Sequence, residues 1–328
     1  MAQEDGTGNA GGGGGGRAPR YTAAAARSSA RRYPRELLES LRPKQGGKAS
    51  AAGEALWDAS APMSAAWLGH ATTLLRLGNQ WVLTDPVFSD RIGLRVGPHT
   101  FGVGRRTPIL DPALLPPIDL ILISHAHFDH LDVPSLRRLA SARTRVVTAS
   151  GTAGLIPKGF GGVLEVPWQG ETTVGDLTIR ALRPNHWGAR TLWDKHRKFN
   201  SYVIETPAHR VLFAGDTALS EAYDAVGRGG GVDLSIFGIG AYNPWVHAHA
   251  TPEQALTMHR AAGGEWLMPV HHSTFELSDE PLDEPLHRLR AALTEGEWAK
   301  VVGTQIGKLW TPGTERGASP EADPDAAK

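Results

Sequence analysis

The stretch Ser124-His125-Ala126-His127-Phe128-Asp129-His130 decides how this chain is organised. It follows the apolar run Ile118-Asp119-Leu120-Ile121-Leu122-Ile123, which we expect to be a buried strand because it is short, β-branched and bounded by prolines. In α/β sheets, sites form where strands end. Since alternate residues of an extended segment face the same way, the first two histidines should face one point. The aspartate and the last histidine, beyond the turn, should face another, so the pattern predicts two adjacent metal ions.

Imidazole and carboxylate groups at this density are typical of sites for zinc and similar ions. One alternative is a set of three solvated histidines in a polar loop. Another is a single structural zinc, which fits poorly because structural zinc sites usually contain cysteine and this chain has none.

Length and composition allow a sizeable core and exclude several classes of partner. The 328 residues are 41% hydrophobic, enough for one large domain or two small ones. The formal net charge is zero, so nothing indicates a nucleic-acid partner. The acidic start, Met1-Ala2-Gln3-Glu4-Asp5, does not resemble a secretory signal, and no stretch has transmembrane length. We therefore expect a cytoplasmic protein with, at most, a peripheral membrane contact.

Composition divides the chain into four parts. Residues 1–32 form a tail of Gly, Ala, Ser and Arg that cannot bury enough apolar surface to become ordered. We expect this tail to be a solvated linker. Because its arginines make its second half basic, the alternative is a contact with anionic lipids. Residues 33–64 should hold a short amphipathic helix, at 34–41, and a linker. Residues 65–310 should form the folded domain, and 311–328 a disordered polar tail.

Apolar runs bounded by turn residues predict the strands of the folded domain. Two strands, 66–77 and 80–85, should pair across Gly78-Asn79. Residues 86–112 have no clear period and should form a long loop. Further strands are expected at seven places: 145–148, 163–166, 176–182, 201–205, 210–214, 233–240 and 266–270.

Two helices have clear start signals. One should cover 133–140, with Asp132 as N-cap. The other should run from Thr251-Pro252-Glu253-Gln254 to about Ala262, because this start combines a capping box with proline at the first helical position. Strands alternating with helices predict a mixed α/β sandwich with the helices outside.

One pattern recurs along the chain: a buried strand ends, and the residues that follow can bind a metal. Strands of one layered fold can bring such ends to one edge, so distant ligands can converge. The pattern occurs at Asp85, at His125 to His130, at His186, at Asp216 and at His271.

These motifs resemble the metallo-β-lactamase superfamily. More narrowly, they are similar to the zinc phospholipase D that hydrolyses N-acyl-phosphatidylethanolamine, in a branch that includes sugar-phosphate lactonases. The resemblance runs from about residue 65 to 285. The segments that carry it are Trp67-Leu68-Gly69-His70-Ala71-Thr72, Leu83-Thr84-Asp85-Pro86-Val87-Phe88-Ser89, Leu122-Ile123-Ser124-His125, Phe213-Ala214-Gly215-Asp216-Thr217, Ile239-Gly240-Ala241-Tyr242 and His271-His272-Ser273-Thr274-Phe275.

The resemblance implies an αββα four-layer sandwich that holds two Zn²⁺ ions, although histidine and carboxylate ligands also accept Mn²⁺ or Fe²⁺. It further implies that Asp216 bridges the two ions. The remaining ligands would be His125, His127 and His186 at the first ion, and Asp129, His130 and His271 at the second.

The resemblance also implies the chemistry. A hydroxide between the metals would attack a phosphodiester in a small-molecule or phospholipid substrate, with Asp129, Asp216 and His249 as the catalytic residues. His249 could donate a proton to the leaving alkoxide, and the alternative is a surface histidine at a helix start. Asp85 would orient a ligand histidine through its other ring nitrogen, and His70 is expected to be structural. The alternatives are a sugar-phosphate lactonase or other ester hydrolase, and a metal-binding protein of the same fold without catalysis.

Smaller interpretations concern the walls of the site. We expect His272 to be a hydrogen-bonded structural residue, with a substrate contact as the alternative. Three aromatic residues could line a pocket, although each alone is more often part of a core: Trp187, Trp193 and Tyr242.

Overall fold

The computed structural model describes Arg27, Ser28, Ala30, Pro34, Trp57 and residues 60–313 except 98 and 192. Apart from Pro34, the expected helix at 34–41 lies outside the described residues, as do most of the two expected tails. Within this part of the chain, no helix is long and apolar enough to cross a membrane.

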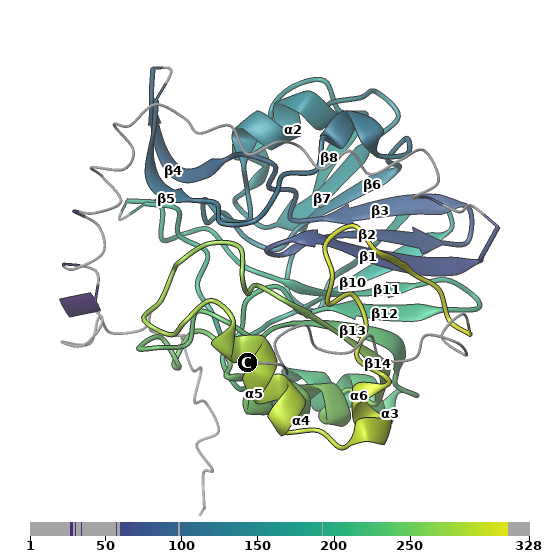
Figure 1. The fold of residues 1–328 in the computed structure, drawn as a ribbon. Helices are drawn as coiled ribbons and strands as arrows, with labels where there is room; N and C mark the ends of the chain where they lie inside the picture. The colour runs from purple at the N-terminus through teal and green to yellow at the C-terminus, as the bar shows by residue number, and fades with distance from the viewer. Residues whose placement is uncertain are drawn as a thin grey trace, which may run out of the picture.

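Two β-sheets stack face to face and form the centre of the molecule (Figure 1). The first sheet has the order β15-β1-β2-β3-β6-β7-β8. Its strands are β1 (Met63–Gly69), β2 (Thr72–Leu77), β3 (Gln80–Thr84), β6 (Leu120–Ile123), β7 (Arg145–Ala149), β8 (Gly162–Val166) and β15 (Leu309–Trp310).

The second sheet has the order β14-β13-β12-β11-β10-β9. Its strands are β9 (Glu171–Val174), β10 (Leu177–Leu182), β11 (Ser201–Glu205), β12 (Arg210–Phe213), β13 (Val232–Gly238) and β14 (Gly264–Val270). The strands predicted at 201–205 and 210–214 are confirmed as β11 and β12, which pair antiparallel as a hairpin with Glu205 opposite Arg210.

Strand β6 shows why the central runs are apolar at every position. Leu120 and Leu122 lie in the core between the two sheets, whereas Ile121 and Ile123 lie in a second core on the outer face. All four side chains are fully buried. Strands covered on both faces lose the alternation of apolar and polar residues that half-exposed strands show.

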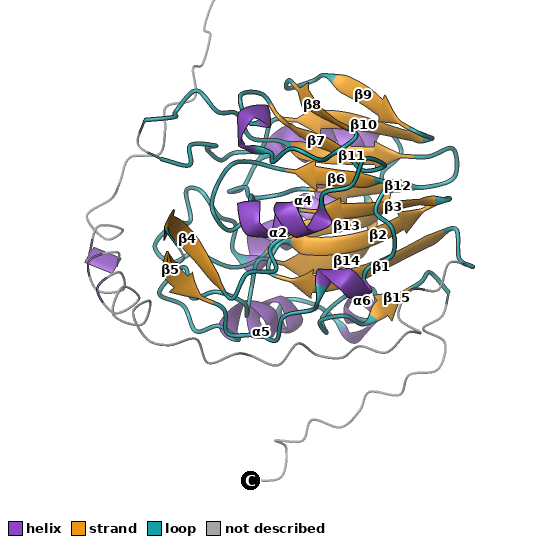
Figure 2. Ribbon diagram, turned by 90° about the horizontal axis from the view of Figure 1, so that it is seen from above, coloured by secondary structure: helices purple, strands orange, loops and turns teal. Residues whose placement is uncertain are grey.

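Helices cover both outer faces and complete an αββα sandwich, as the sequence predicts (Figure 2). Helix α2 (Val133–Leu139) covers the first sheet, and its N-cap Asp132 accepts a hydrogen bond from the Ser135 amide, as predicted. The described helices on the other side are α3 (Asp224–Arg228), α4 (Pro252–Ala261), α5 (Glu284–Ala291) and α6 (Glu295–Trp298). In addition, the domain has short 3₁₀ helices at Pro112–Leu114, Ala153–Leu155 and Glu221–Tyr223.

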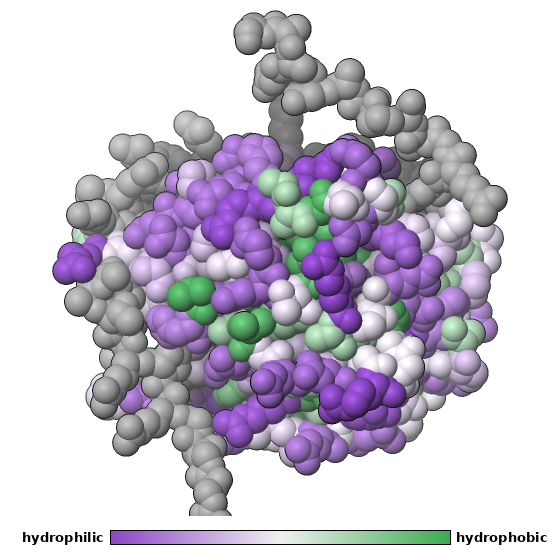
Figure 3. Space-filling view, turned by 90° about the horizontal axis from the view of Figure 1, so that it is seen from below, coloured by the Kyte–Doolittle hydropathy of each residue, from purple (hydrophilic) through white to green (hydrophobic). Residues whose placement is uncertain are grey.

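Helix α4 begins at the predicted capping box. The Thr251 hydroxyl accepts from the Gln254 amide, and the Gln254 side chain accepts from the Thr251 amide. Seen from the side of α4 and α5, the molecule presents a mainly hydrophilic surface with small apolar areas, as expected for an outer layer (Figure 3).

Two sequence predictions about the first hundred residues of the domain are wrong. Residues 66–77 do not form one strand, because the chain turns at His70 and Ala71 between β1 and β2. Residues 86–112 are not an irregular loop, because β4 (Arg91–Val96) and β5 (His99–Gly104) pair as a separate two-stranded hairpin. This hairpin projects from the side of the sandwich (Figure 1).

The direction of the strands explains where a site can form. In the first sheet β3 and β6 are parallel and β2 is antiparallel to β1 and β3, so β1, β3 and β6 all end at one edge. In the second sheet the same pairing rules bring the ends of β10, β12 and β14 to one edge. Each of these six strands is followed by a histidine or an aspartate that the sequence analysis singled out.

Candidate metal centre

The structure brings all the predicted metal ligands together at this edge. Together with His70, these residues form two main groups, and in each group the candidate ligand atoms all lie within 4.8 Å of one another. The first group is His125, His127, His186 and Asp216, and the second is His70, Asp129, His130 and His271.

Asp216 lies between the two groups. Its Oδ2 is 3.8 Å from His125 Nε2 and 3.6 Å from His186 Nε2 in the first group. The same oxygen is 3.1 Å from His130 Nε2 in the second group, and Oδ1 is 3.4 Å from His271 Nε2. A carboxylate in this position can contact ions in both groups.

The outer nitrogens of three histidines are held by acceptors. His186 Nδ1 donates to the carbonyl of Ala248 at 2.9 Å, and His130 Nδ1 lies 2.7 Å from Asp85 Oδ2. His125 Nδ1 lies 2.9 Å from the Ser124 hydroxyl, which itself donates to Asp85. These bonds leave each Nε2 to face the centre of the cluster, as in metal sites where a ligand histidine is oriented through its second nitrogen.

Asp85 is the fixed point of this network. The residue directly follows β3, is fully buried and also accepts the Ser124 amide at 2.7 Å. Its backbone φ is 31°, and those of His70 and His271 are 52° and 60°. Left-handed backbone at non-glycine residues is costly and concentrates at functional sites, and here it turns three strand ends sharply toward one point.

Burial and mutual charge set the ionisation of the cluster. Burial holds the pKa of His125 and of His186 well below the ordinary histidine value and lowers that of His127 to about 4. These rings are therefore neutral at neutral pH, the form that binds metals.

The second group behaves differently in the metal-free protein. Burial would lower the pKa of His130, but the surrounding carboxylates, led by Asp216 and Asp129, raise it well above the ordinary value. Burial would likewise raise the pKa of both aspartates, yet His130 and the other histidines hold it well below the ordinary value. Carboxylates that stay ionised while buried need positive charge beside them.

Unpartnered buried atoms show that a cation fits this cluster. His130 Nε2, Asp216 Oδ2 and both ring nitrogens of His271 are buried and make no hydrogen bond. Such atoms are costly unless something else satisfies them. A divalent ion is the chemical partner that several imidazole nitrogens and carboxylate oxygens share.

The remaining predicted residues fall into different places. His249 joins the site, with Nδ1 3.7 Å from Asp216 Oδ2 and its ring centre 5.1 Å from that of His186. His272 points elsewhere, stacked on Trp67 at 4.5 Å with Nδ1 2.8 Å from the Ser273 hydroxyl.

Of the three aromatic candidates, Trp187 lines a cavity beside the metal donors. Trp193 is 92% exposed and does not line this cavity. Tyr242 is buried against α5, where its hydroxyl donates to Glu284.

The sequence did not predict the role of Arg190, which holds the metal-binding loop by hydrogen bonds. Arg190 donates from one guanidinium nitrogen to the carbonyls of Ala126 and Leu131, at 2.9 and 2.8 Å, and its guanidinium lies 3.9 Å from the ring centre of Phe128. Burial lowers its pKa to about 10, so it stays charged at neutral pH. The two bonds bracket the ligand run from both ends. No sequence signal marked Arg190, which lies in a polar segment.

The αββα fold and the two donor groups at its strand ends are those of the metallo-β-lactamase class. The chain belongs to the β-lactamase superfamily domain family, whose profile matches residues 80–272. The resemblance predicted from the sequence motifs is thus confirmed.

Three similar proteins illustrate the range of this relationship. The uncharacterized protein Rv0906 of Mycobacterium tuberculosis is 34% identical over 248 residues, which are 70% of this chain and 64% of that protein. The chain therefore spans less than two thirds of that relative. The N-acyl-phosphatidylethanolamine-hydrolyzing phospholipase D 1 of Caenorhabditis elegans is 28% identical over 274 residues, 75% of each chain.

A solved structure shows the same fold. Igni18, described as a novel metallo hydrolase from Ignicoccus hospitalis, superposes with a TM-score of 0.55 at 20% identity. The superposition covers 76% of this chain and 97% of Igni18.

Proposed function

We propose that this protein is a dinuclear-metal phosphodiesterase that cleaves an amphiphilic phosphodiester of the N-acyl-phosphatidylethanolamine type. The observation that carries the proposal is a large apolar cavity that opens directly beside the metal donors. Its volume is about 960 Å³, and His127 and Asp129 form part of its wall. This size is near the upper end of the roughly 300–1,000 Å³ of small-molecule sites.

The rest of the wall is almost entirely apolar. One side is the hairpin β4–β5, through Ile92, Leu94, Phe101 and Val103. The other side comes from the main body of the domain, through Phe128, Trp187 and Leu277, and Ala30 and Pro34 of the N-terminal part complete the wall. A substrate that places an ionic phosphodiester at the metal centre could bury a hydrocarbon chain here, and burial of apolar surface favours binding by roughly 25 cal/mol per Å².

The residues that would hold the two cations are those of the two donor groups apart from His70, with Asp216 placed between the two groups. When bound, divalent cations supply a Lewis acid for phosphoryl oxygens and an acidic water as nucleophile. The protein contributes the fixed arrangement. The bonds from Asp85, Ser124 and Ala248 to the ring nitrogens prevent the ligands from rotating.

His249 is placed to contact a phosphoryl group held at the centre, because its ring stands beside Asp216 and His186. Burial lowers its pKa to about 4, so the ring is neutral at neutral pH. We therefore assign it the role of a neutral hydrogen-bonding group that orients the substrate. A protonated imidazole acting as general acid, the role suggested by the motif, would be scarce at this pKa.

The test is a hydrolysis assay with purified protein of defined metal content. The proposal expects cleavage of both N-acyl-phosphatidylethanolamine and the activated diester bis(p-nitrophenyl) phosphate, and loss of both activities in Asp216→Ala. Metal-replete protein that is inert on both diesters but opens lactones would overturn the proposal in favour of the lactonase alternative. Fewer than two ions per chain and no turnover of any ester would favour the non-catalytic alternative.

The cavity is tested separately with Phe101, which lies on the hairpin away from the donors. Phe101→Asp places a charge in the apolar wall and should raise KM for the long-chain lipid while leaving the small diester unaffected. Phe101→Leu is the matched control, because it keeps the wall apolar. If Phe101→Asp impaired the hydrolysis of both substrates equally, or of neither, the result would show that the cavity does not bind the lipid chain.

A further inference from the structure

His70 stands in the second donor group, although neither the sequence nor the family motif assigns it a role there. It occupies the sharp turn between β1 and β2 and is 1% exposed. Its amide donates to the Thr274 hydroxyl at 2.8 Å, and its carbonyl accepts from the Trp67 indole at 2.7 Å and from the His271 amide at 2.9 Å. The turn is therefore held rigidly beside the strand end that carries His271.

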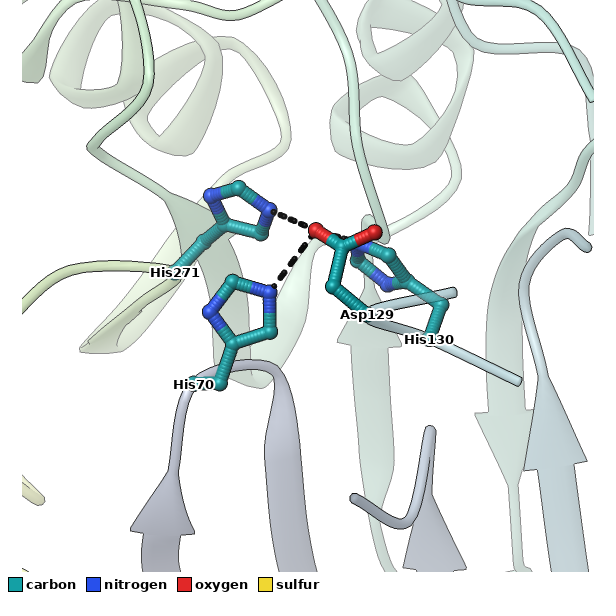
Figure 4. A group of neighbouring side chains, drawn as sticks. All are labelled: His70, Asp129, His130 and His271. Atoms are coloured by element: carbon teal, nitrogen blue, oxygen red, sulfur yellow. Dashed lines mark hydrogen bonds and ion pairs between the residues drawn. The ribbon is translucent and has the colours of Figure 1, made fainter. Parts of the chain in front are cut away.

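The side chain of His70 points at one carboxylate oxygen (Figure 4). Its Nε2 lies 3.0 Å from Asp129 Oδ2 with the geometry of a hydrogen bond. A carboxylate oxygen of an ionised aspartate only accepts hydrogen bonds. A carboxylate that binds a metal ion is ionised, so the proton of this bond belongs to His70 Nε2.

Two other histidines surround the same oxygen and differ from His70. His271 Nε2 is 3.3 Å and His130 Nε2 is 3.5 Å from Asp129 Oδ2. Both of these nitrogens are buried without a hydrogen-bond partner. Neither nitrogen is committed to a hydrogen bond, so both are available to a cation, whereas the His70 nitrogen is already satisfied by the carboxylate.

We propose that His70 is a positioning residue that donates its Nε2–H to Asp129 and fixes the carboxylate between His130 and His271. Without this bond Asp129 could rotate about its side-chain torsions, and the second ion would lose the geometry of one ligand. The inference depends on the metal centre alone. It does not depend on which ester the protein cleaves, so it can fail or succeed independently of the proposed substrate.

Two nearly isosteric variants separate the hydrogen bond from packing. His70→Gln keeps an N–H at the end of an unbranched chain, and His70→Met has similar shape without a donor. Both place a non-glycine residue at the same φ of 52°, so the backbone cost is matched. His259→Met is the control for removing a buried, hydrogen-bonded histidine elsewhere, since His259 contacts Ser235 on the outer side of the second sheet.

The readout is the number of ions per chain and their two dissociation constants, measured by competition with a graded series of chelators. Loss of partners that orient metal ligands typically weakens metal binding by roughly 10–100-fold. We expect His70→Met to weaken one of the two sites by that factor, with the other site unchanged. We expect His70→Gln to recover most of the affinity and His259→Met to bind both ions as the wild type does.

Three results would overturn the inference. Wild-type affinities in His70→Met would show that the bond does not position Asp129. Equal weakening of both sites together with a lowered melting temperature would show a merely structural role. A changed d–d absorption spectrum of the Co²⁺-loaded protein in both His70 variants, with no rescue by glutamine, would identify His70 as a direct ligand.

Discussion

Replacing Asp85 with asparagine tests how the metal centre is held, because the change preserves shape and removes one acceptor. Asp85 uses both oxygens: Oδ1 accepts the Ser124 amide at 2.7 Å, and Oδ2 accepts His130 Nδ1 at 2.7 Å and also the Ser124 hydroxyl. The hydroxyl can rotate, but an asparagine has one oxygen for the two N–H donors. In either orientation its amide group faces another N–H across one of the two short contacts.

The two orientations have different costs. The Ser124 backbone amide is always a donor, and leaving this N–H without an acceptor in such a fully buried place costs about 1–3 kcal/mol. His130 can move its proton from Nδ1 to Nε2, and that nitrogen already lies 3.1 Å from Asp216 Oδ2. We therefore expect Asp85→Asn to trap His130 with a proton on Nε2, the nitrogen that faces the cation.

The expected result is a second site weakened by roughly 10–100-fold, which corresponds to about 1.4–2.7 kcal/mol. The assay is chelator competition, with urea unfolding of the metal-free protein run beside it to confirm that both proteins are folded. Asp119→Asn is the matched control, because Asp119 likewise accepts a backbone amide, that of Trp81 at 2.9 Å, but contacts no ligand histidine. Wild-type affinity for both ions in Asp85→Asn would refute the reasoning.

Three further predictions concern stability, each measured by urea unfolding of the metal-free protein. Tyr202→Phe removes a buried hydroxyl that donates to the Ile123 carbonyl at 3.0 Å, and should cost about 1–3 kcal/mol; an unchanged midpoint would contradict it. Thr251→Ala removes the cap of α4 and should cost about 0.5–2 kcal/mol, whereas Thr251→Ser should recover most of it. Burial lowers the pKa of His259 to about 4, so the unfolded chain binds more protons between that value and the ordinary value near 6.5, and stability falls as the pH drops through this window. His259→Gln should therefore lose less stability than the wild type between pH 7.5 and pH 5, by up to about 2 kcal/mol, and equal losses would refute the assignment.

The sequence predicted the strand ends well because the central strands are buried on both faces. Runs such as Leu120–Ile123 are apolar at every position, and the first polar residue after each run marks the edge of the sheet. Every predicted ligand came from such a junction, and the structure brings all of them to one place.

What the sequence did not predict depends on contacts between distant segments. The turn at His70 interrupts a continuous apolar run, and it is held by Thr274 and His271, about two hundred residues away. Local propensity therefore favoured an unbroken strand and a merely structural histidine.

The hairpin β4–β5 was missed for a related reason. Gly93 and Gly102 face each other across it with φ of 141° and 155°, and a Cβ on either would overlap a carbonyl of the opposite strand. In a single sequence, glycines usually indicate a loop, although here they allow two strands to approach closely. For the same reason, the sequence did not predict that this hairpin forms an apolar wall of the cavity.

The division of the donors between the two sheets has a consequence for the lifetime of the protein. His125 and His130 follow a strand of one sheet, whereas Asp216 and His271 follow strands of the other. Ions held by both would act as a non-covalent cross-link between the two halves of the sandwich, and ligands that bind the folded state alone stabilise it by about 2.7 kcal/mol at a hundredfold excess over Kd. In a cell short of metal, the halves would separate more often, so the supply of metal would govern how long each molecule survives proteolysis.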